Sequence, residues 1–376
     1  MNNKKNKKTV IYIAPTPPPY MGPSIATQII LGSRFIDEFN VIHIDTADRR
    51  PLSRLAKIDI TNFYLAFKHY FILLRRLACS RADLVYVPIS QTAIGFLRDI
   101  PFILLAKLFR KKVVLHLRGG HFREFYDSSN GFVKLLIRKV LNFADRMIVL
   151  GNSLKILFDG LIPEEKLSVV PNGLNIGLDK IREKNPQKDN LLILFLSNLI
   201  ETKGFKDVLY SVKKVTRNHT NVKYIFVGAW RNDKDRFECS DYIKREKIED
   251  YVEFKGSVTG SNKTRLLRDA DIFAFPTYYP MEGHPWVIVE AMASSLPIIT
   301  TDQGCIKESV IDGENGFVIS KRNPDLIAEK IIYFVENSAA RERMGQKSRE
   351  LYEANFTEEH FVQRMIDVIN LTLDSR

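Results

Sequence analysis

Two glutamates eight positions apart, Glu282 and Glu290, lie in the part of the chain with the clearest chemical pattern. The surrounding segment 276–302 reads PTYYPMEGHPWVIVEAMASSLPIITTD and follows a short apolar run. Gly283 permits a tight backbone turn and Pro285 fits the first position of a helix, so we expect a loop that leads into a helix. Carboxylates on such a loop and helix could accept hydrogen bonds from the hydroxyls of a sugar.

Glu290 is the single charged residue in the apolar run 286–293, which forms the expected helix. A carboxylate inside such a helix is costly unless another group hydrogen-bonds it. A ribose diol is one candidate partner, and a neighbouring Lys or Arg is the plain structural alternative. The amides and the positive dipole end at the start of the helix favour an anion nearby. A nucleotide diphosphate offers both a diol and an anion.

Two further segments place polar groups after an apolar run. In SNLIETKGF, residues 197–205, Lys203 and Gly204 precede an expected helix, where an ammonium and helix amides suit a phosphate. A solvated surface lysine is the alternative. In PTPPPYMGPS, residues 15–24, Gly22 opens a loop at the start of a helix and allows close approach of a phosphate or sugar. The chain has no GxGxxG fingerprint and no GxxxxGK[ST] phosphate loop.

These groups need strands and helices to position them, and both halves of the chain alternate apolar runs with longer helical segments. Runs rich in Val, Ile and Leu are typical of parallel strands, and their alternation with helices predicts βαβ units. We therefore expect an α/β protein with two doubly wound, Rossmann-like parallel-sheet domains that face a cleft, and ligands beyond the carboxyl ends of the strands. The expected strands are 9–15, 41–45, 84–89, 112–118, 146–150 and 167–171, then 191–197, 223–228, 252–256, 271–275, 297–301 and 316–319.

The length of 376 residues suits two domains. We expect residues 1–180 to form the N-terminal domain and residues 190–355 the C-terminal domain, with the polar stretch 178–190 as a linker. No strand follows the last two expected helices, about 340–354 and 358–373. We therefore expect the second of them, the segment 358–376, to return to the N-terminal domain.

The formal charge of +12 is concentrated in one half of the chain. Residues 1–190 carry 30 Lys and Arg against 16 Asp and Glu, a net of +14, and residues 191–376 carry 26 against 28, a net of −2. The basic half could meet an anionic lipid, a phosphorylated substrate or nucleic acid, or could serve solubility alone. We expect no nucleic-acid partner because the usual binding motifs are missing.

Two helical segments in the basic half, 63–77 and 94–112, are strongly apolar with interspersed Lys and Arg. They could lie in a membrane interface, or they could simply pack on the sheet. Pro101 interrupts the second segment, so its helix is expected to begin there.

Cysteine use and hydropathy indicate a cytoplasmic protein. Cys79, Cys239 and Cys305 are scattered and form no CxxC pattern, which indicates reduced thiols and no metal site. The longest uncharged stretches are shorter than the ~18–20 residues of a membrane-spanning helix. The basic N-terminus is followed by an apolar run that Pro15 ends too soon for a signal peptide.

Taken together, these segments resemble glycosyltransferase family 4, whose members are retaining enzymes with the GT-B fold. The resemblance extends from the first expected strand to about residue 373. Its most specific element is the E-x7-E pair formed by Glu282 and Glu290. Supporting motifs are SNL…KG at 197–204, ADRMIVLGNSLK at 144–155, VPNG at 170–173 and DGENGFVI at 312–319.

The resemblance implies a role for each residue of the main motif. Glu290 is similar to the family glutamate that holds the ribose hydroxyls of the donor. Glu282 is similar to the one near the transferred sugar and the reacting centre. The amides of Gly283 and His284 would meet sugar hydroxyls, and Lys203 would hold the diphosphate as it leaves.

Gly22 matches the family's loop glycine near the donor phosphates and the acceptor, but two other positions depart from the family pattern. Asn198 stands where the family commonly has Arg, and it can still donate a hydrogen bond to the leaving group. In LHLRGGHFREFY, Arg118 stands where the family commonly has His, with His116 and His121 beside it. Either Arg118 or His121 could contact the sugar, and His116 could equally be a buried core residue.

The implied reaction moves a sugar from a nucleotide diphosphate sugar to an acceptor hydroxyl with retention of configuration, without a cofactor or a metal. Asp269 and Asp271 match a metal-binding DxD only in letters, because Asp271 heads a strand. The basic half fits a lipid-linked or oligosaccharide acceptor in bacterial surface-glycan synthesis, with the protein cytoplasmic or peripheral on the inner face of the membrane. The alternatives are a glycoside hydrolase that uses the glutamate pair, a catalytically silent nucleotide-sugar-binding partner subunit, and a nucleotide-sugar epimerase.

Overall fold

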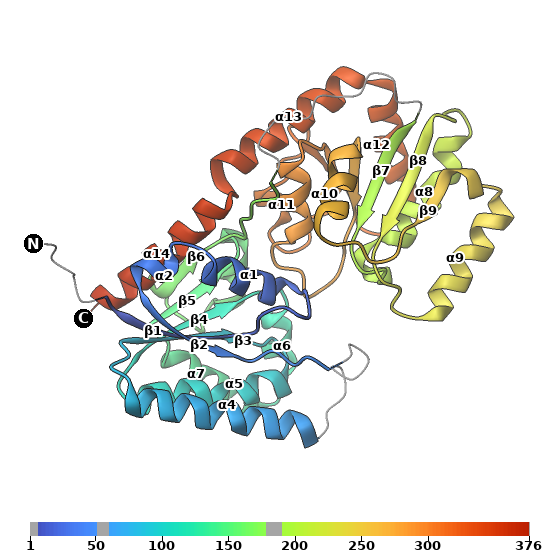
Figure 1. Ribbon diagram of the computed structural model, residues 1–376. Helices are drawn as coiled ribbons and strands as arrows, with labels where there is room; N and C mark the ends of the chain where they lie inside the picture. The colour runs from blue at the N-terminus through green and yellow to red at the C-terminus, as the bar shows by residue number, and fades with distance from the viewer. Residues whose placement is uncertain (1–6, 51–59, 178–189, 376) are drawn as a thin grey trace, which may run out of the picture. The chain divides into compact units, whose positions relative to one another are not determined.

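The computed structural model describes residues 7–50, 60–177 and 190–375. The expected linker at 178–190 falls almost wholly outside the described residues. By its contacts the chain divides into two compact units, which Figure 1 shows as ribbons. Unit 1 comprises Met1–Asn172 with Glu358–Arg376, and unit 2 comprises Gly173–Thr357.

Unit 1 contains a six-stranded parallel sheet in the order β2-β1-β3-β4-β5-β6 (Figure 1). Its strands are almost entirely buried in the centre of the sheet, as expected for Val- and Ile-rich runs covered by helices on both faces. The strands are β1 (Thr9–Ala14), β2 (Asn40–Asp45), β3 (Leu84–Ile89), β4 (Lys112–Leu117), β5 (Arg146–Val149) and β6 (Leu167–Val169).

Helices cover both faces of this sheet. In Figure 1, α1, α2 and α14 lie above the sheet, and α4, α5 and α7 lie below it. The last helix of the chain, α14, therefore packs in unit 1 with the first ones. The helices are α1 (Gly22–Leu31), α2 (Phe35–Glu38), α4 (Ile60–Cys79), α5 (Ala93–Leu108), α6 (Phe122–Ser128), α7 (Gly131–Asn142) and α14 (Glu358–Asp374), with 3-10 turns η1 (Asn152–Phe158) and η2 (Glu164–Lys166).

The predicted start of α5 at Pro101 is wrong, because the helix begins at Ala93 and continues through the proline. Thr92 caps this start, and its side chain accepts a hydrogen bond from the Gly95 amide at 3.3 Å. Proline removes one helical hydrogen bond, but its fixed φ is compatible with the helix. The buried residues Ile100 and Phe102 on either side of it hold the helix against the rest of unit 1.

Unit 2 contains a second six-stranded parallel sheet, in the order β12-β11-β10-β7-β8-β9. The strands are β7 (Leu191–Leu196), β8 (Val222–Val227), β9 (Val252–Phe254), β10 (Ile272–Phe275), β11 (Ile298–Thr300) and β12 (Gly316–Val318). The helices are α8 (Phe205–Thr216), α9 (Asp233–Glu246), α10 (Gly260–Asp269), α11 (Trp286–Ala293), α12 (Pro324–Glu336) and α13 (Ser338–Asn355), with 3-10 turns η3 (Glu201–Lys203), η4 (Glu249–Tyr251) and η5 (Ile306–Glu308).

The strand order of unit 2 defines where a ligand can bind. From β7 the chain builds β8 and β9 on one side, and then returns to place β10 on the other side of β7. The connections diverge between β7 and β10, and open α/β sheets bind ligands outside the carboxyl ends of the strands at such a point. In unit 1 the same divergence occurs between β1 and β3.

All twelve predicted strands are present, most of them one or two residues shorter than predicted. The predicted α/β architecture with two doubly wound parallel sheets is therefore confirmed. In the part of the chain that the structure describes, no helix combines the length and apolar content needed to cross a membrane.

Candidate functional site

Lys203 and Glu282 form an ion pair at the carboxyl edge of the unit 2 sheet. Lys203 ends η3, shortly after β7, and Glu282 lies in the loop after β10. The Lys203 ammonium bonds Oε2 of Glu282, and only 14% and 11% of the two side chains are exposed. Since β7 and β10 flank the divergence of the sheet connections, the pair stands where such sheets bind ligands.

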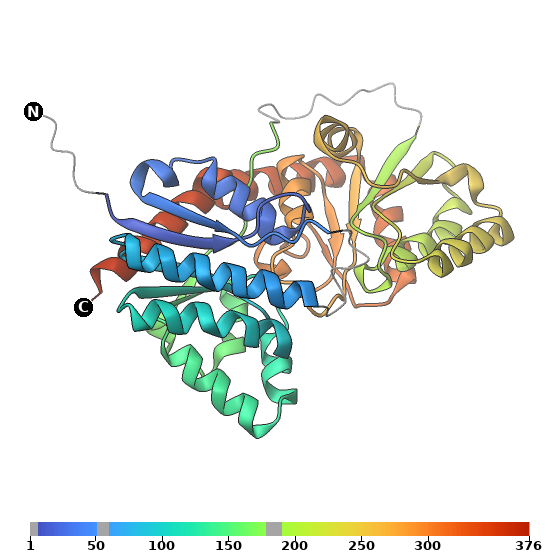
Figure 2. The same ribbon diagram turned by 60° about the horizontal axis from the view of Figure 1, so that its bottom comes forward.

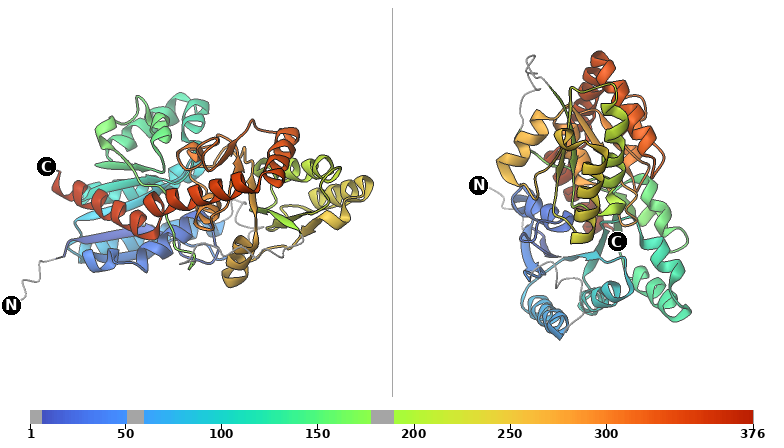
Figure 3. Two further views of the ribbon diagram at one scale, coloured as in Figure 1. Left: turned by 90° about the horizontal axis from the view of Figure 1, so that it is seen from above. Right: turned by 90° about the vertical axis from the view of Figure 1, so that its right-hand side faces the viewer.

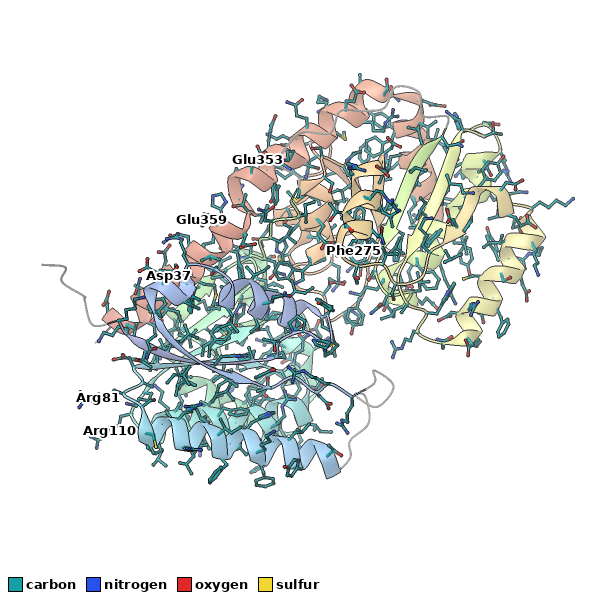
Figure 4. All side chains as sticks on the ribbon, viewed as in Figure 1. Asp37, Arg81, Arg110, Phe275, Glu353 and Glu359 are labelled. Carbon is teal, nitrogen blue, oxygen red and sulfur yellow. The ribbon has the colours of Figure 1, made fainter. Side chains whose placement is uncertain are left out.

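The loop after β10 holds this pair from several sides. The Lys203 ammonium lies over the ring of Tyr279, 4.4 Å from its centroid, and an aromatic face attracts a cation. The Thr277 hydroxyl lies 3.3 Å from Oε2 of Glu282 and 3.4 Å from the Thr202 carbonyl, so it connects the two loops. Figure 4 labels Phe275, the last residue of β10, from which this loop starts.

Two glycines allow the loops to approach so closely. Gly204, just after Lys203, has φ +84°, and a Cβ there would lie 2.4 Å from the Pro276 carbonyl oxygen. Gly304, in the loop after β11, has φ +62°, and a Cβ there would lie 2.3 Å from the carbonyl oxygen of Gly283 and 2.6 Å from that of Glu282. Both positions combine a left-handed backbone with a space that no side chain fits.

Glu290 lies on α11 and is buried, with an ion pair to Lys263. The Lys263 ammonium, in the first turns of α10, lies 2.5 Å from Oε1 of Glu290. Glu290 thus has the neighbouring lysine that the sequence left open as an alternative to a ribose partner. The second oxygen, Oε2, is buried without a hydrogen-bond partner among the described residues. Burial raises the pKa of the Glu290 carboxyl, and the Lys263 charge opposes that rise.

The other predicted donor-site residues of unit 2 lie in the same loops. Asn198 is exposed two residues after β7, and Gly283 lies in a bend whose carbonyl accepts the Cys305 amide at 3.0 Å. The His284 side chain is buried and bonds the Ser309 hydroxyl at 2.7 Å. Pro285 is the N-cap of α11 rather than its first residue, because its ψ of 127° is extended.

Asp269 and Asp271 lie away from this site. Asp271 immediately precedes β10, and its carboxylate accepts the amide of Leu192 at 2.9 Å, so it ties together the amino ends of β10 and β7. Asp269 pairs with Arg268. The site residues described above follow the opposite, carboxyl ends of the strands.

In unit 1, His116 is buried and Arg118 is half-buried. His116 on β4 is fully buried, and its Nδ1 lies 2.8 Å from the Tyr86 hydroxyl. Burial, reinforced by the charge of Arg118, holds the pKa of His116 well below its usual range. The Arg118 guanidinium donates to Oδ1 of Asn172 at 2.6 Å and lies over the ring of Phe361, on α14. His116 therefore has the contacts of a core histidine.

His121 and Gly22 lie in loops at the carboxyl edge of the unit 1 sheet. His121 is the N-cap of α6 after β4, its side chain is 31% exposed, and its Nδ1 lies 3.7 Å from a Glu124 oxygen. Its amide donates to the Gln91 side chain, in the loop after β3, at 2.8 Å. Gly22 is the first residue of α1 and directly follows the loop after β1, as predicted.

The structure thus brings Lys203, Glu282 and Glu290 onto one edge of one sheet, and places Arg118, His121 and Gly22 in unit 1. Sequence reasoning missed Lys263, Thr277 and Gly304. The sequence held a usable signal for two of these residues. Lys263 lies at the start of the helix after β9, and Thr277 lies in the loop after β10. Both positions are at the carboxyl edge of a parallel sheet, where ligands bind. Gly304 carried no such signal, since its role depends on a close approach between two loops.

Comparison with known proteins agrees with this geometry. Residues 178–351 match the family of glycosyl transferases group 1. This stretch covers most of unit 2, including Lys203, Glu282 and Glu290, and it confirms the predicted resemblance at the level of group 1. The family 4 assignment and the retaining mechanism stay predictions.

Curated relatives include enzymes of glycan synthesis. The chain is 28% identical over 256 residues to the capsular polysaccharide biosynthesis glycosyltransferase CapM of Staphylococcus aureus, over 64% of this chain and 66% of the relative. It is 30% identical over 184 residues to spore coat protein SA of Bacillus subtilis, over 47% of this chain and 48% of the relative. The chain thus spans about half to two thirds of the length of these relatives.

Solved structures show the same fold over nearly the whole chain. Alr3699/HepE of Anabaena, in complex with UDP, aligns with a TM-score of 0.72 at 18% identity, over 97% of this chain and 100% of that chain. The same Anabaena protein has also been solved with UDP-glucose. Sucrose-phosphate synthase of Thermosynechococcus elongatus aligns with a TM-score of 0.76 at 16% identity. The predicted GT-B fold is confirmed.

Proposed function

We propose that this chain is a retaining glycosyltransferase that moves a sugar from a nucleotide diphosphate sugar to the hydroxyl of a lipid-linked or oligosaccharide acceptor in surface-polysaccharide synthesis. The match to glycosyl transferases group 1 and the likeness to a capsular polysaccharide glycosyltransferase support the reaction class. The UDP and UDP-glucose complexes of the Anabaena neighbour support a nucleotide-sugar donor.

The proposal rests on one observation, the buried and unpartnered Oε2 atom of Glu290 among the described residues. A buried carboxylate with one oxygen unpartnered among the described residues is costly, and a hydroxyl donor from a ligand would remove that cost. In the proposal, the ribose hydroxyls fill this position. Glu282 and Glu290 both follow β10, and Lys203 follows the neighbouring strand β7. In the proposal, a ligand anchored at Glu290 extends along the edge that carries this cation for its phosphates.

The Lys203–Glu282 ion pair offsets the cost of burying two charged side chains before the donor binds. Each side chain neutralises the other where both are mostly buried. In the proposal, the arriving diphosphate competes for Lys203, and Glu282 is then available to accept a sugar hydroxyl. When the glycosidic bond breaks, its electron pair goes to the diphosphate, and Lys203 stabilises the added negative charge.

In unit 1 we propose His121, rather than Arg118, as the residue that meets the transferred sugar. His121 is partly exposed in a loop after β4, whereas the Arg118 guanidinium is occupied by Asn172 and Phe361. Gly22 opens a second loop at the same edge, suited to the donor phosphates and the acceptor. We expect no cofactor and no metal requirement, so activity should persist in a chelator.

Glu290→Gln tests the proposal directly. The amide keeps the shape but removes a charged acceptor, and hydrogen bonds to charged groups contribute about 1.5–3 kcal/mol. We expect nucleotide affinity, measured by calorimetry with UDP, GDP and ADP in parallel, to fall by about tenfold or more. Glu253→Gln is the matched control, because Glu253 also pairs with a lysine but lies on β9. Unchanged affinity in Glu290→Gln would refute the role of Glu290.

The raised pKa of Glu290 adds a pH dependence to this test. The neutral carboxyl favours the folded state at low pH, and this contribution is lost as pH rises through the raised pKa. The melting temperature of the wild type should therefore decrease relative to that of Glu290→Gln as pH rises. Nucleotide affinity should change in the opposite sense, since only the ionised Glu290 accepts both hydroxyls.

One incubation separates the alternatives. With a nucleotide sugar and no acceptor, a transferase leaves the donor largely intact, a hydrolase releases free sugar, and an epimerase converts the nucleotide sugar. A silent partner subunit would bind the nucleotide sugar and turn over nothing even with membrane-extracted acceptor.

A further inference from the structure

Helix α4 presents a stripe of large apolar side chains outward. Tyr64, Phe67, Phe71 and Leu74 are all exposed, and Tyr64, Phe67 and Phe71 have about two thirds of their surface accessible. Their spacing of three and four residues places them on one side of the helix. The side that packs inward carries Leu73 and Leu77 instead. Helix α4 therefore carries apolar side chains on two sides, and only one of these sides packs into the core.

Helix α5 repeats this arrangement beside α4. Ile94, Leu97, Leu104 and Leu108 are exposed at helical spacing. The two helices pack against each other, with the Tyr70 ring of α4 edge-on to Phe102 of α5 at 4.9 Å. Figures 2 and 3 show the helices side by side on the same side of the unit 1 sheet. We call the exposed sides of α4 and α5 together the α4–α5 face.

The helices of this face carry mostly basic charged residues. Helices α4, α5 and the adjacent α7 contain eight Lys and Arg, three, two and three respectively, against one acid, Asp99. Asp99 is buried and bonds Arg98 and the Ser90 amide. Arg81 and Arg110, just beyond the ends of α4 and α5, project outward in Figure 4. Asp45 and Asp48 also lie near the start of α4, but each pairs with an arginine, Arg49 and Arg50 respectively. The exposed charged side chains that α4, α5 and α7 themselves contribute are therefore basic.

We propose that the α4–α5 face docks unit 1 onto an anionic lipid bilayer. Aromatic and leucine side chains enter the headgroup boundary, while Lys68 and Arg75, exposed beside the aromatic stripe, pair with anionic headgroups. A second copy of the chain is a poorer occupant, because two such faces would oppose positive charge to positive charge. Charge complementarity thus selects an anionic surface.

The direction of the helices connects this docking to the carboxyl edge of the sheet. Helix α5 starts directly after the carboxyl end of β3, and α4 ends directly before the start of β3. The N-terminal ends of both helices, with Tyr64 and Ile94, therefore lie toward the edge that carries Gly22 and His121. A bilayer held on this face would present a lipid-linked acceptor near that edge. The docking itself does not depend on the proposed reaction.

Flotation of the full chain with phosphatidylglycerol-containing vesicles, without nucleotide, tests this proposal. We expect binding at about 0.1 M salt that weakens near 1 M, where the Debye length falls from ~10 to ~3 Å. Pure phosphatidylcholine vesicles should bind much less. The double variant Phe67→Ser, Phe71→Ser should reduce the bound fraction about tenfold or more at low salt, and Lys68→Glu, Arg75→Glu should do the same.

Matched controls lie in unit 2. Phe237→Ser removes a ring on α9 with the same 68% exposure as Phe67 and Phe71, and Lys234→Glu reverses an exposed charge on the same helix. Both should bind vesicles as the wild type does. All variants should keep the wild-type melting temperature and nucleotide affinity, which separates lost docking from misfolding and from failure of the proposed reaction.

Three outcomes would overturn the proposal. The first is failure of the wild type to float with anionic vesicles at low salt, and the second is flotation of the face variants equal to that of the unit 2 controls. The third is a dimer in sedimentation that Phe67→Ser, Phe71→Ser converts to a monomer, which would assign the face to a second copy of the chain.

Discussion

At the residue scale, the candidate site contains two carboxylates with different environments. Glu282 is neutralised by Lys203 and is still partly accessible, whereas Glu290 is buried with one oxygen unpartnered among the described residues. The first environment suits a group that exchanges partners during a reaction. The second suits a fixed anchor that waits for a hydroxyl. We therefore propose separate tasks for the two glutamates of this motif, since the fold surrounds them differently.

Lys203→Ala tests the proposed leaving-group role. Loss of one preorganised donor at a developing anion costs about 3–4 kcal/mol, so turnover should fall about 100-fold or more. Lys206→Ala is the matched control, because Lys206 is similarly buried and ion-paired, with Asp235 and Glu238, three residues away on α8. That variant should lose stability but keep turnover. Near-normal steady-state rates in Lys203→Ala would contradict the role.

At the element scale, the site depends on loops that lie in close contact after adjacent strands. The loop after β11 packs against the loop after β10 through Gly304, and η3 packs against it through Gly204. A loop held on both sides keeps the backbone at Glu282 in one position. Rigid placement of this kind reduces the cost of orienting a substrate.

Gly304→Ala should displace the Glu282 loop. Its Cβ would fall 2.3 Å from the Gly283 carbonyl oxygen, so the backbone that carries Glu282 must shift. We expect kcat/KM with the nucleotide sugar to fall at least tenfold, because small misplacements at a reacting centre are costly. Gly313→Ala carries similar backbone strain, at φ +78°, but its Cβ meets nothing within 4 Å. Equal losses in both variants would show that strain, and not loop contact, is responsible.

At the scale of the whole molecule, the net positive charge and the Lys203, Glu282 and Glu290 cluster belong to different units. The net positive charge belongs to the first half of the sequence, and the exposed apolar helices α4 and α5 lie in unit 1. The Lys203, Glu282 and Glu290 cluster lies in unit 2. Membrane docking and donor binding are therefore proposed for separate units.

Hydrogen exchange of the intact chain can test this division. Added UDP should slow amide exchange in the unit 2 loops 197–204 and 276–290, and added anionic vesicles should slow it in α4 and α5. Each addition should leave the other region unchanged, because each ligand contacts different residues. Slowed exchange in α4 and α5 with UDP alone, or in the unit 2 loops with vesicles alone, would contradict the division.

The sequence by itself determined the strands and the loops that carry the candidate site residues. Apolar runs and their alternation with helices are local patterns, so twelve strands and the positions of Lys203, Glu282 and Glu290 after or near them could be predicted. The tertiary structure decided which groups meet. Lys203 and Glu282 are 79 residues apart, and Glu290 and Lys263 are 27 apart, so no local pattern pairs them. Likewise, only packing shows that Arg118 points to Asn172 and that α4 turns half of its apolar surface outward.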